Sequence, residues 1–292
     1  GILQHIEQAG VHSGDSACSI PPYDISKEAI NKIEIEVEKV ISNMKIIGLV
    51  NVQLAYVNNN VYLLEVNPRA SRTIPFVSKA LGVPLARVAA KVMAGKSLKD
   101  LKFQNVPNLE GFFVKEAVMP FNKFQNVDPI LGPEMRSTGE VMGIGNSFAE
   151  AFEKAEVGAG VEIPKEGSVF ISVRDTDKQF LSEIVPSLVE EDFNLIATKG
   201  TASVIKNMGF KVSQIKKVIE GRPNIVDLMK NKEVNLVINT TEGRESILDS
   251  ASIRRTALDE KICCTTTIKG AKAICEVITK KVDWSYRKLQ DM

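Results

Sequence analysis

The sequence has very few histidines: His5 and His12 are the only two in 292 residues. We therefore do not expect a histidine-based zinc site, or a catalytic triad that needs a histidine base. The sequence also lacks an apolar run of the roughly 20 residues that a membrane-spanning helix needs, and no signal peptide opens it. Its net charge is only +1, so we expect neither nucleic acid nor a membrane as a partner.

Cysteine is also scarce, with four in the chain. Cys263 and Cys264 are adjacent, which is a poor arrangement for an ordinary disulfide, and this usage predicts a reduced, cytoplasmic protein. Apolar residues make up 44% and charged residues 25%, as in soluble globular proteins, and the length allows two domains. There is no initiator Met, and residues 1–10 read as the interior of a fold, so we expect a fragment of a longer polypeptide.

The densest polar chemistry lies in a predicted β-hairpin. Two runs rich in β-branched and aromatic residues flank three asparagines at 58–60, which is a hairpin signal. Residue 59 is the midpoint between Gln53 and Glu65, so a symmetric register places these two side chains opposite each other. Asn67 then lies on the same face, because side chains alternate along a strand.

This face of the hairpin would present two amides and a carboxylate, with Arg69 and Arg72 just beyond the second strand. Oxygen donors of this kind suit Mg²⁺, which also binds the phosphate oxygens of a nucleotide. Arginines suit an oxyanion substrate. The pattern predicts phosphoryl chemistry on a nucleotide.

The periodicity divides the chain into two regions that meet in a glycine-containing stretch at 158–167. Before it, antiparallel strands mix with covering helices, which is an α+β arrangement. Beyond it, strands and helices alternate regularly, which predicts an α/β domain with a mostly parallel sheet. We predict domains at 1–160 and 161–292. The second has predicted strands at 168–173, 194–197, 211–212, 236–239 and 261–264, and predicted helices at 177–190, 201–207, 224–230, 245–257 and 269–279.

Two polar clusters, at 198–201 and 239–244, each follow a predicted strand and open a predicted helix. Backbone N–H groups at a helix start, with hydroxyls and a lysine, form a cradle for an anion. We expect the two cradles to lie on adjacent strand ends and to share one phosphate, with Lys178 and Lys217 as further cations. Each cluster is also compatible with an ordinary helix cap, and each lysine with an ordinary surface residue.

Longer stretches resemble the C-terminal part of the large subunit of carbamoyl phosphate synthetases. The matching stretches run in order along the chain: EQAGVHSGDS at 7–16, LEVNPRASR at 64–72, PFVSK at 75–79, LGPEMRSTGE at 131–140 and EGRP at 220–223. The resemblance implies the C-terminal portion of an ATP-grasp fold, followed by a methylglyoxal-synthase-like allosteric domain. The ATP-grasp portion would end the second synthetase half, which phosphorylates carbamate with a second ATP.

Carried over by position, the resemblance implies a site for ATP and Mg²⁺ or Mn²⁺, with K⁺ as a further candidate ion. The implied metal ligands are Gln53, Glu65 and Asn67, and the first two also border the nucleotide. Arg69 and Arg72 would lie near the transferred phosphate. The implied nucleotide loop consists of Gly10, Val11, His12 and Ser13.

The resemblance also implies two regulatory sites. Glu7, Asp15 and Glu116 would surround ornithine between the two domains. Ornithine-activated relatives carry an aromatic and then an acidic residue before two threonines, where this chain reads CCTTT at 263–267, so ornithine control stays open. A nucleotide monophosphate, UMP or IMP, would bind at Lys178, Thr198, Thr201, Lys217, Asn239, Thr240 and Thr241.

The implied partners are the remainder of the large subunit and a small glutamine amidotransferase subunit, in an enzyme that forms oligomers. The adenine-binding segment and the phosphate-covering lid would lie upstream of Gly1, so we expect this chain alone to be inactive as a synthetase. The alternative is a stand-alone module that senses a nucleotide monophosphate without catalysis. Methylglyoxal synthase needs a catalytic histidine, and no histidine follows His12, so the sequence disfavours that enzyme. Biotin carboxylase is disfavoured because the first region here leads into a regulatory α/β domain.

Overall fold

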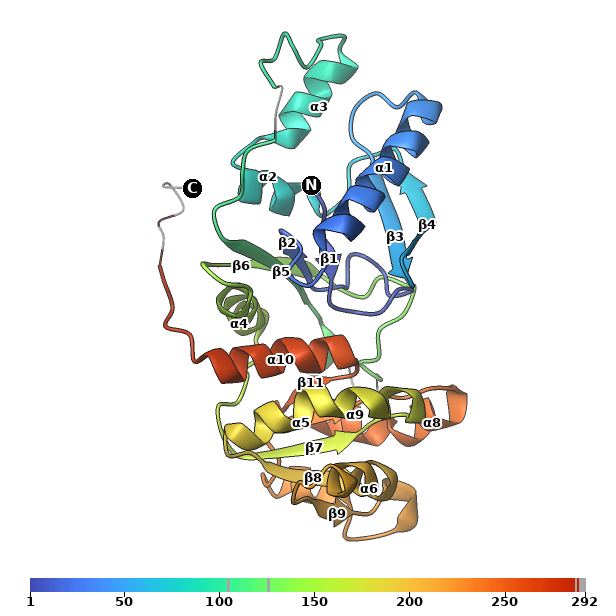
Figure 1. Ribbon diagram of the computed structural model, residues 1–292, viewed down its shortest axis with the longest axis vertical. Helices are drawn as coiled ribbons and strands as arrows, with labels where there is room; N and C mark the ends of the chain where they lie inside the picture. Colours follow the sequence, from blue (N-terminus) through green and yellow to red (C-terminus); the bar gives the residue numbers. More distant parts are fainter. Residues whose placement is uncertain (104–105, 125–126, 287, 289–292) are drawn as a thin grey trace.

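The computed structural model describes residues 1–103, 106–124, 127–286 and 288, and two main sheets organise them (Figure 1). The first is antiparallel with strand order β1-β2-β5-β6, and the second has the order β11-β10-β7-β8-β9. A separate hairpin, β3-β4, lies beside helix α1. Figure 1 shows α4 and α10 lying between the two main sheets.

The elements up to residue 160 follow the predicted α+β arrangement. Helix α1 begins after Ser26, whose hydroxyl accepts a hydrogen bond from the backbone nitrogen of Ala29 and so caps the helix. The hairpin turns at Asn58 and Asn59, which have φ values of 49° and 63° and so fit a two-residue turn. The bounds are β1 Gln4–His5, β2 Cys18–Ile20, α1 Lys27–Met44, β3 Asn51–Val57, β4 Asn60–Asn67, α2 Ile74–Leu81, α3 Leu85–Met93, β5 Phe112–Val118, the 3₁₀ turn η1 Phe121–Lys123, β6 Gly139–Gly145 and α4 Phe148–Ala159.

Strand β6 lies directly against the backbone of α4. A Cβ atom added at Gly143 would overlap the carbonyl oxygen of Ala151 and lie 2.6 Å from the amide nitrogen of Ala155. Glycine therefore allows this strand and helix to approach more closely than any other residue would. The contact fixes α4 on one face of the first sheet.

The elements beyond residue 160 form the predicted parallel sheet, in which every described strand pair is parallel. Three local predictions were wrong. The edge strand is 213–215 rather than 211–212, the predicted helix 245–257 is two helices that meet at Ser250, and a 3₁₀ turn precedes α5. The bounds are β7 Ser168–Ser172, η2 Asp175–Phe180, α5 Leu181–Glu190, β8 Asn194–Thr198, α6 Lys199–Asn207, β9 Ser213–Ile215, η3 Val218–Glu220, α7 Ile225–Lys230, β10 Leu236–Asn239, α8 Arg244–Asp249, α9 Ala251–Asp259, β11 Cys263–Thr265 and α10 Ile268–Lys280.

The hydrophobic core is continuous from one sheet to the other. One cluster of buried side chains joins Ile6, Val114 and Phe152 to residues of β7, β10, α5 and α10. Tyr23 stacks on Phe148 with ring centroids 3.7 Å apart, beside this cluster. The predicted division at residue 160 falls between α4 and β7, and it stays a prediction because the two regions share this core.

The segment after α10 returns to α4. The backbone nitrogen and hydroxyl of Ser285 both donate to the Glu150 carboxylate, and Trp284 Nε1 donates to Glu153 Oε2 at 2.9 Å. Burial alone would raise the pKa of Glu150, but hydrogen bonds from Lys154, Ser285 and the Asn146 backbone lower it to about 2. Residues 284–285 thus tie the second region to the first.

All four cysteines lie in the described part of the chain and are free. Cys263 is buried and Cys264 half-buried, and burial raises the pKa of the Cys264 thiol to about 12. Both therefore act as small apolar side chains rather than reactive thiols. No helix in the described ranges combines the length and apolar character needed to cross a bilayer.

Candidate functional site

Gln53 lies opposite Glu65, as predicted, but for a different reason than a symmetric register. Near the two-residue turn, each step back along β3 is matched by one step forward along β4, from the pair of Val57 with Asn60 to the pair of Leu54 with Leu63. This pattern would place Leu64 opposite Gln53. A β-bulge between Leu54 and Gln53 adds one residue to β4, so Glu65 takes that place.

The bulge puts the predicted oxygen donors on one face of the hairpin. Asn67 Nδ2 donates to Glu65 Oε1 at 2.9 Å, which shows that these two side chains lie together, and Gln53 is the cross-strand neighbour of Glu65. The bond uses the amide nitrogen of Asn67, so its amide oxygen remains available as a ligand. The described residues contain no group of three or more His, Cys, Asp or Glu suited to a metal. A cation here would therefore need the amide oxygens beside Glu65, and such hard donors fit Mg²⁺.

Arg72 is held by a segment far away in the sequence. Its guanidinium donates to Ser137 Oγ at 3.1 Å and to the Ser137 carbonyl at 3.3 Å, and its Nε lies 4.0 Å from Glu140 Oε1. Glu140 in turn lies 3.7 Å from the ammonium of Lys115, which is fully buried. Arg69 is exposed, and its described hydrogen bond goes to the adjacent Ala70 carbonyl. The structure thus fixes one of the two predicted arginines, through residues that the sequence analysis missed.

The predicted nucleotide loop is anchored to the same segment. The His12 backbone nitrogen donates to the Gly132 carbonyl at 2.8 Å, and His12 Nδ1 accepts from the Gly14 nitrogen. The Asp15 carboxylate accepts from the backbone nitrogens of Arg136 at 2.7 Å and Ser137 at 2.9 Å. Val11 closes a turn with Gln8, Gly10 has a φ of 104°, and the Ser13 carbonyl accepts from Lys115.

Asp15 therefore has a structural task that the resemblance did not suggest. Both of its oxygens bind backbone N–H groups, so in this structure it holds the loop against residues 136–137. The other two predicted ornithine residues behave differently: Glu7 Oε2 and Glu116 Oε2 are buried and have no hydrogen-bond partner among the described residues.

A half-buried acidic cluster consists of Glu7 from the loop after β1, Glu116 from β5 and Glu156 from α4. Burial raises the pKa of Glu7 well above its usual value, and the neighbouring Glu116 raises it further. Burial also raises the pKa of Glu116 to about 7, and that of Glu156 rises through burial and the charges of Glu116 and Glu7. The sequence analysis missed Glu156, because its helical spacing gives no sign that it faces the other two.

We expect Glu116→Gln to stabilise the chain at alkaline pH. The folded-state pKa of about 7 lies above the usual 4.5, so the folded state binds more protons between these values. The contribution of Glu116 to stability is therefore fully present below pH 4.5 and is lost as pH rises through about 7. The variant should unfold at higher urea than the wild type at pH 8, by roughly 1–3 kcal/mol, with little difference at pH 4.5. The exposed Glu110→Gln is the control, and an equal gain at both pH values would contradict the prediction.

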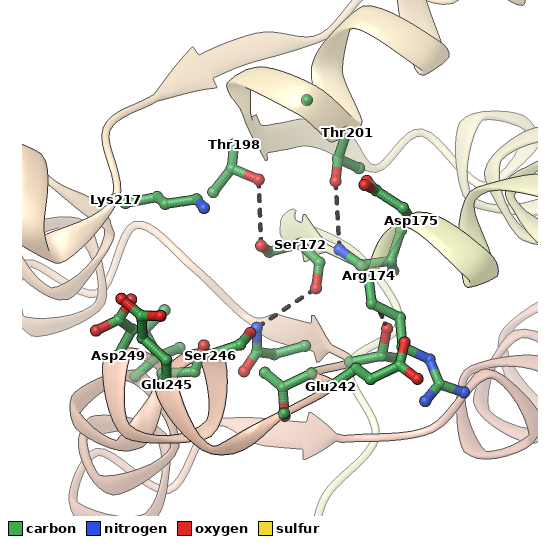
Figure 2. A pocket seen from close by; sticks show the side chains of 18 of the residues that line it. Ser172, Arg174, Asp175, Thr198, Thr201, Lys217, Glu242, Glu245, Ser246 and Asp249 are labelled. Atoms are coloured by element: carbon green, nitrogen blue, oxygen red, sulfur yellow. Dashed lines mark hydrogen bonds between the residues drawn. The ribbon is translucent and has the colours of Figure 1, made fainter.

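A pocket of about 720 Å³ opens at the carboxyl end of the parallel sheet (Figure 2). All seven predicted effector residues line it: Lys178, Thr198, Thr201, Lys217, Asn239, Thr240 and Thr241. The predicted adjacency of the two cradles was wrong, because β7 lies between β8 and β10. Ser172, at the end of β7, bridges them: its hydroxyl lies 3.1 Å from Thr198 Oγ1, and its carbonyl accepts from the Thr240 backbone nitrogen.

The first turn of α6 faces this pocket with its backbone donors uncapped by a side chain. Thr198 precedes the helix but makes no side-chain cap, because its hydroxyl contacts Ser172 instead. Thr201 Oγ1 accepts from the Val173 nitrogen, which leaves its own O–H free to donate. Lys178 Nζ lies 3.2 Å from where a Cβ on Gly200 would be, so glycine lets the ammonium approach the helix start.

Figure 2 shows acidic side chains on the wall opposite Thr198, Thr201 and Lys217. These are Glu242, Glu245 and Asp249, and Ser246 lies among them. The side of the pocket with Thr198 and Thr201 also carries Lys217 and Lys178, and the Lys178 ammonium lies 2.7 Å from Asp175 Oδ1. This side offers hydroxyls and lysines to an anion, and the opposite side is rich in hydrogen-bond acceptors. Sequence reasoning included Glu242 in the cluster at 239–244, but it missed Arg174 and the residues that α8 adds to this wall. The end of the predicted strand at 168–173 was the one signal for Ser172.

The comparisons with known proteins agree along the whole chain. The family described as carbamoyl-phosphate synthase L chain, ATP binding domain, matches residues 3–101, and the family described as MGS-like domain matches residues 181–266. The carbamoyl phosphate synthase large chain of Pseudomonas putida is 56% identical over 293 residues, which covers 100% of this chain. The chain belongs to the carbamoyl phosphate synthase large-chain family. It spans 27% of the length of that relative.

Similar solved structures include a methylglyoxal synthase from Elizabethkingia anophelis, at 17% identity and a TM-score of 0.33, covering 39% of this chain and 79% of that one. Another is the biotin carboxylase domain of a thermophilic 2-oxoglutarate carboxylase, at 12% identity and a TM-score of 0.35, covering 50% of this chain and 43% of that one. Scores this low carry no argument on their own. The predicted fold class, an ATP-grasp portion followed by a methylglyoxal-synthase-like domain, is confirmed by the family matches and the two sheets.

Proposed function

We propose that this chain serves a carbamoyl phosphate synthase large subunit in the ATP- and Mg²⁺-dependent phosphorylation of carbamate. The observation that carries the proposal is the hairpin face on which Gln53, Glu65 and Asn67 lie together, within a chain of this family. Mn²⁺ could replace Mg²⁺ at such donors, and K⁺ is a further candidate ion. The partners would be the rest of the large subunit and a small glutamine amidotransferase subunit.

Gln53, Glu65 and Asn67 would hold the metal. A bound divalent ion neutralises charge on the ATP phosphates during transfer. Arg72, fixed by Ser137 and near Glu140, would orient the anionic acceptor, and the exposed Arg69 could move to meet the transferred phosphate. Residues 10–13 would border the nucleotide from the loop anchored at Gly132. A general base is not required, because carbamate is already ionised.

We expect this chain on its own to form no carbamoyl phosphate from ATP and carbamate. Phosphoryl transfer depends on positioning by groups on all sides of the nucleotide, and the chain spans 27% of its relative's length. A coupled assay for carbamoyl phosphate, run on the purified chain and on the full-length subunit, checks this. Clear turnover by the chain alone, above the background without protein, would contradict it.

The second region would bind a nucleotide monophosphate, UMP or IMP, that regulates synthesis. The phosphate would lie at the first turn of α6 with Lys178, Lys217 and Thr201, and the acceptors of the opposite wall suit the hydroxyls of a ribose. Glu7 and Glu116 could receive the ammonium groups of ornithine, since each has a buried oxygen without a described partner. The alternative is that the chain acts by itself as a nucleotide sensor, without catalysis.

Lys178→Ala should weaken binding of UMP to this chain. The ammonium lies beside the start of α6, and one charge-assisted phosphate contact contributes about 1–3 kcal/mol, so the Kd should rise roughly 5- to 150-fold. Isothermal titration calorimetry measures this directly. Lys206→Ala, an exposed lysine in the last turn of the same helix, is the matched control and should leave the Kd unchanged. An unchanged Kd for Lys178→Ala would remove this lysine from the site.

A further inference from the structure

An ion pair between a buried arginine and a half-buried aspartate joins the two regions next to the effector pocket. Arg254, on α9, is 1% exposed and grips the Asp128 carboxylate with two nitrogens, Nε at 2.8 Å from Oδ1 and the second guanidinium nitrogen against Oδ2. Asp128 belongs to the segment between η1 and β6 of the first region. A two-point bond between a guanidinium and a carboxylate fixes both position and orientation. Any shift of α9 is therefore passed to Asp128.

On the pocket side, Arg254 is attached to the wall that a ligand would touch. The nitrogen that binds Asp128 Oδ2 also donates to the carbonyl of Ile247, on α8, at 2.7 Å. Helix α8 supplies Glu245, Ser246 and Asp249 to the pocket, and Ile253, which immediately precedes Arg254, also lines it. Contacts between a bound ligand and α8 would thus act directly on the backbone that Arg254 holds.

On the other side, Asp128 begins the segment that holds Arg72. The Asp128 carbonyl accepts from the Arg136 side chain at 3.0 Å, and the backbone of Arg136 and Ser137 binds Asp15. Ser137 receives the guanidinium of Arg72 at its hydroxyl and carbonyl. A continuous set of hydrogen bonds therefore leads from α8, through Arg254 and Asp128, to Arg72 and the loop of His12.

We propose that the Arg254–Asp128 ion pair transmits occupancy of the effector pocket to Arg72, so that both are positioning residues for phosphoryl transfer. The inference rests on the proposed function, because it needs an effector in the pocket. A ligand shifts such a coupled unit only through different affinities for its arrangements. Arg254 Nη1 is buried without a hydrogen-bond partner among the described residues, so the guanidinium has a spare donor with which to change arrangement.

The test compares hydrogen exchange of backbone amides by NMR, with and without UMP, in this chain and its variants. In the wild type, UMP should slow exchange at the first turn of α6 and also at Arg136 and Ser137. Asp128→Asn should keep the first response and lose the second, because it removes the charge that Arg254 grips. Asp259→Asn is the matched control. It removes an ion pair of Arg255, which donates to the carbonyls of Phe124 and Val127, and it leaves the pair of Arg254 with Asp128 intact, so it should keep both responses.

A second readout follows Arg72 itself, through its side-chain Nε–Hε signal. UMP should shift this signal in the wild type and in Asp259→Asn, and not in Asp128→Asn. If Asp128→Asn does not fold, Arg254→Lys is the second variant. It keeps the positive charge but cannot form the bidentate hydrogen bonds to the Asp128 carboxylate, so it should also lose the shift. A response of Arg136, Ser137 and Arg72 that survives in these variants overturns the inference, as does a wild type in which only α6 responds. A wild type in which α6 itself shows no response contradicts the effector site and with it this inference.

Discussion

Glu65→Gln in the full-length large subunit should lower the rate of carbamoyl phosphate formation about 100-fold or more. The carboxylate is the one negative charge among the three proposed metal ligands, and removing it leaves amide oxygens that bind Mg²⁺ weakly. Raising the Mg²⁺ concentration should restore part of the rate. The measurement is steady-state turnover at a series of Mg²⁺ concentrations.

The same substitution should leave stability almost unchanged, because Glu65 is exposed. Urea unfolding of the chain checks this, and separates a lost ligand from a misfolded hairpin. Glu36→Gln, at an exposed glutamate on α1, is the matched control and should alter neither rate nor stability. A Mg²⁺ dependence identical to that of the wild type would exclude Glu65 from the metal site.

Gly143→Ala should cost about 3 kcal/mol or more of folding free energy, which is the largest stability effect expected from one added methyl group here. The new Cβ would meet the backbone of α4 at Ala151 and Ala155, and neither atom can rotate away as a side chain could. Strand β6 and α4 would have to separate, which would open the core beneath Phe148 and Phe152. The measurement is the urea midpoint of this chain.

Gly139→Ala, on the same strand, is the matched control for this effect. Its Cβ would lie 3.8 Å from Val118, an ordinary packing distance, so stability should change by less than about 1 kcal/mol. If the two variants unfolded at the same urea concentration, the close approach of β6 to α4 would not hold.

Local patterns were enough to predict the features that arise from neighbours in the chain. The alternation of strands and helices predicted the parallel sheet, and the asparagine turn predicted the hairpin that carries Gln53 and Glu65. The clusters at 198–201 and 239–244 predicted the two sides of a single pocket. In each case the polar residues and the strand or helix that positions them lie within a few residues of each other in the sequence.

The errors and omissions concern relations between distant segments. The order of strands across the sheet is not encoded locally, so the position of β7 between the two cradles could not be predicted. Ser137 meets Arg72 across 65 residues, and Arg254 meets Asp128 across 126. Asp15 has a carboxylate of the kind that binds ligands, but this carboxylate accepts hydrogen bonds from the backbone nitrogens of Arg136 and Ser137. The local sequence gives no sign that these two residues lie beside Asp15.

The extra residue in β4 has a consequence for how this gene can vary. Since a strand turns alternate residues to opposite sides, inserting or deleting one codon between Gln53 and Glu65 would send the carboxylate to the far side from the amide. A change by a pair of codons would preserve their meeting. We therefore expect the length of this hairpin to change during evolution by even numbers of residues. A change by an odd number of residues would need the gain or loss of the β-bulge at Leu64 to compensate for it.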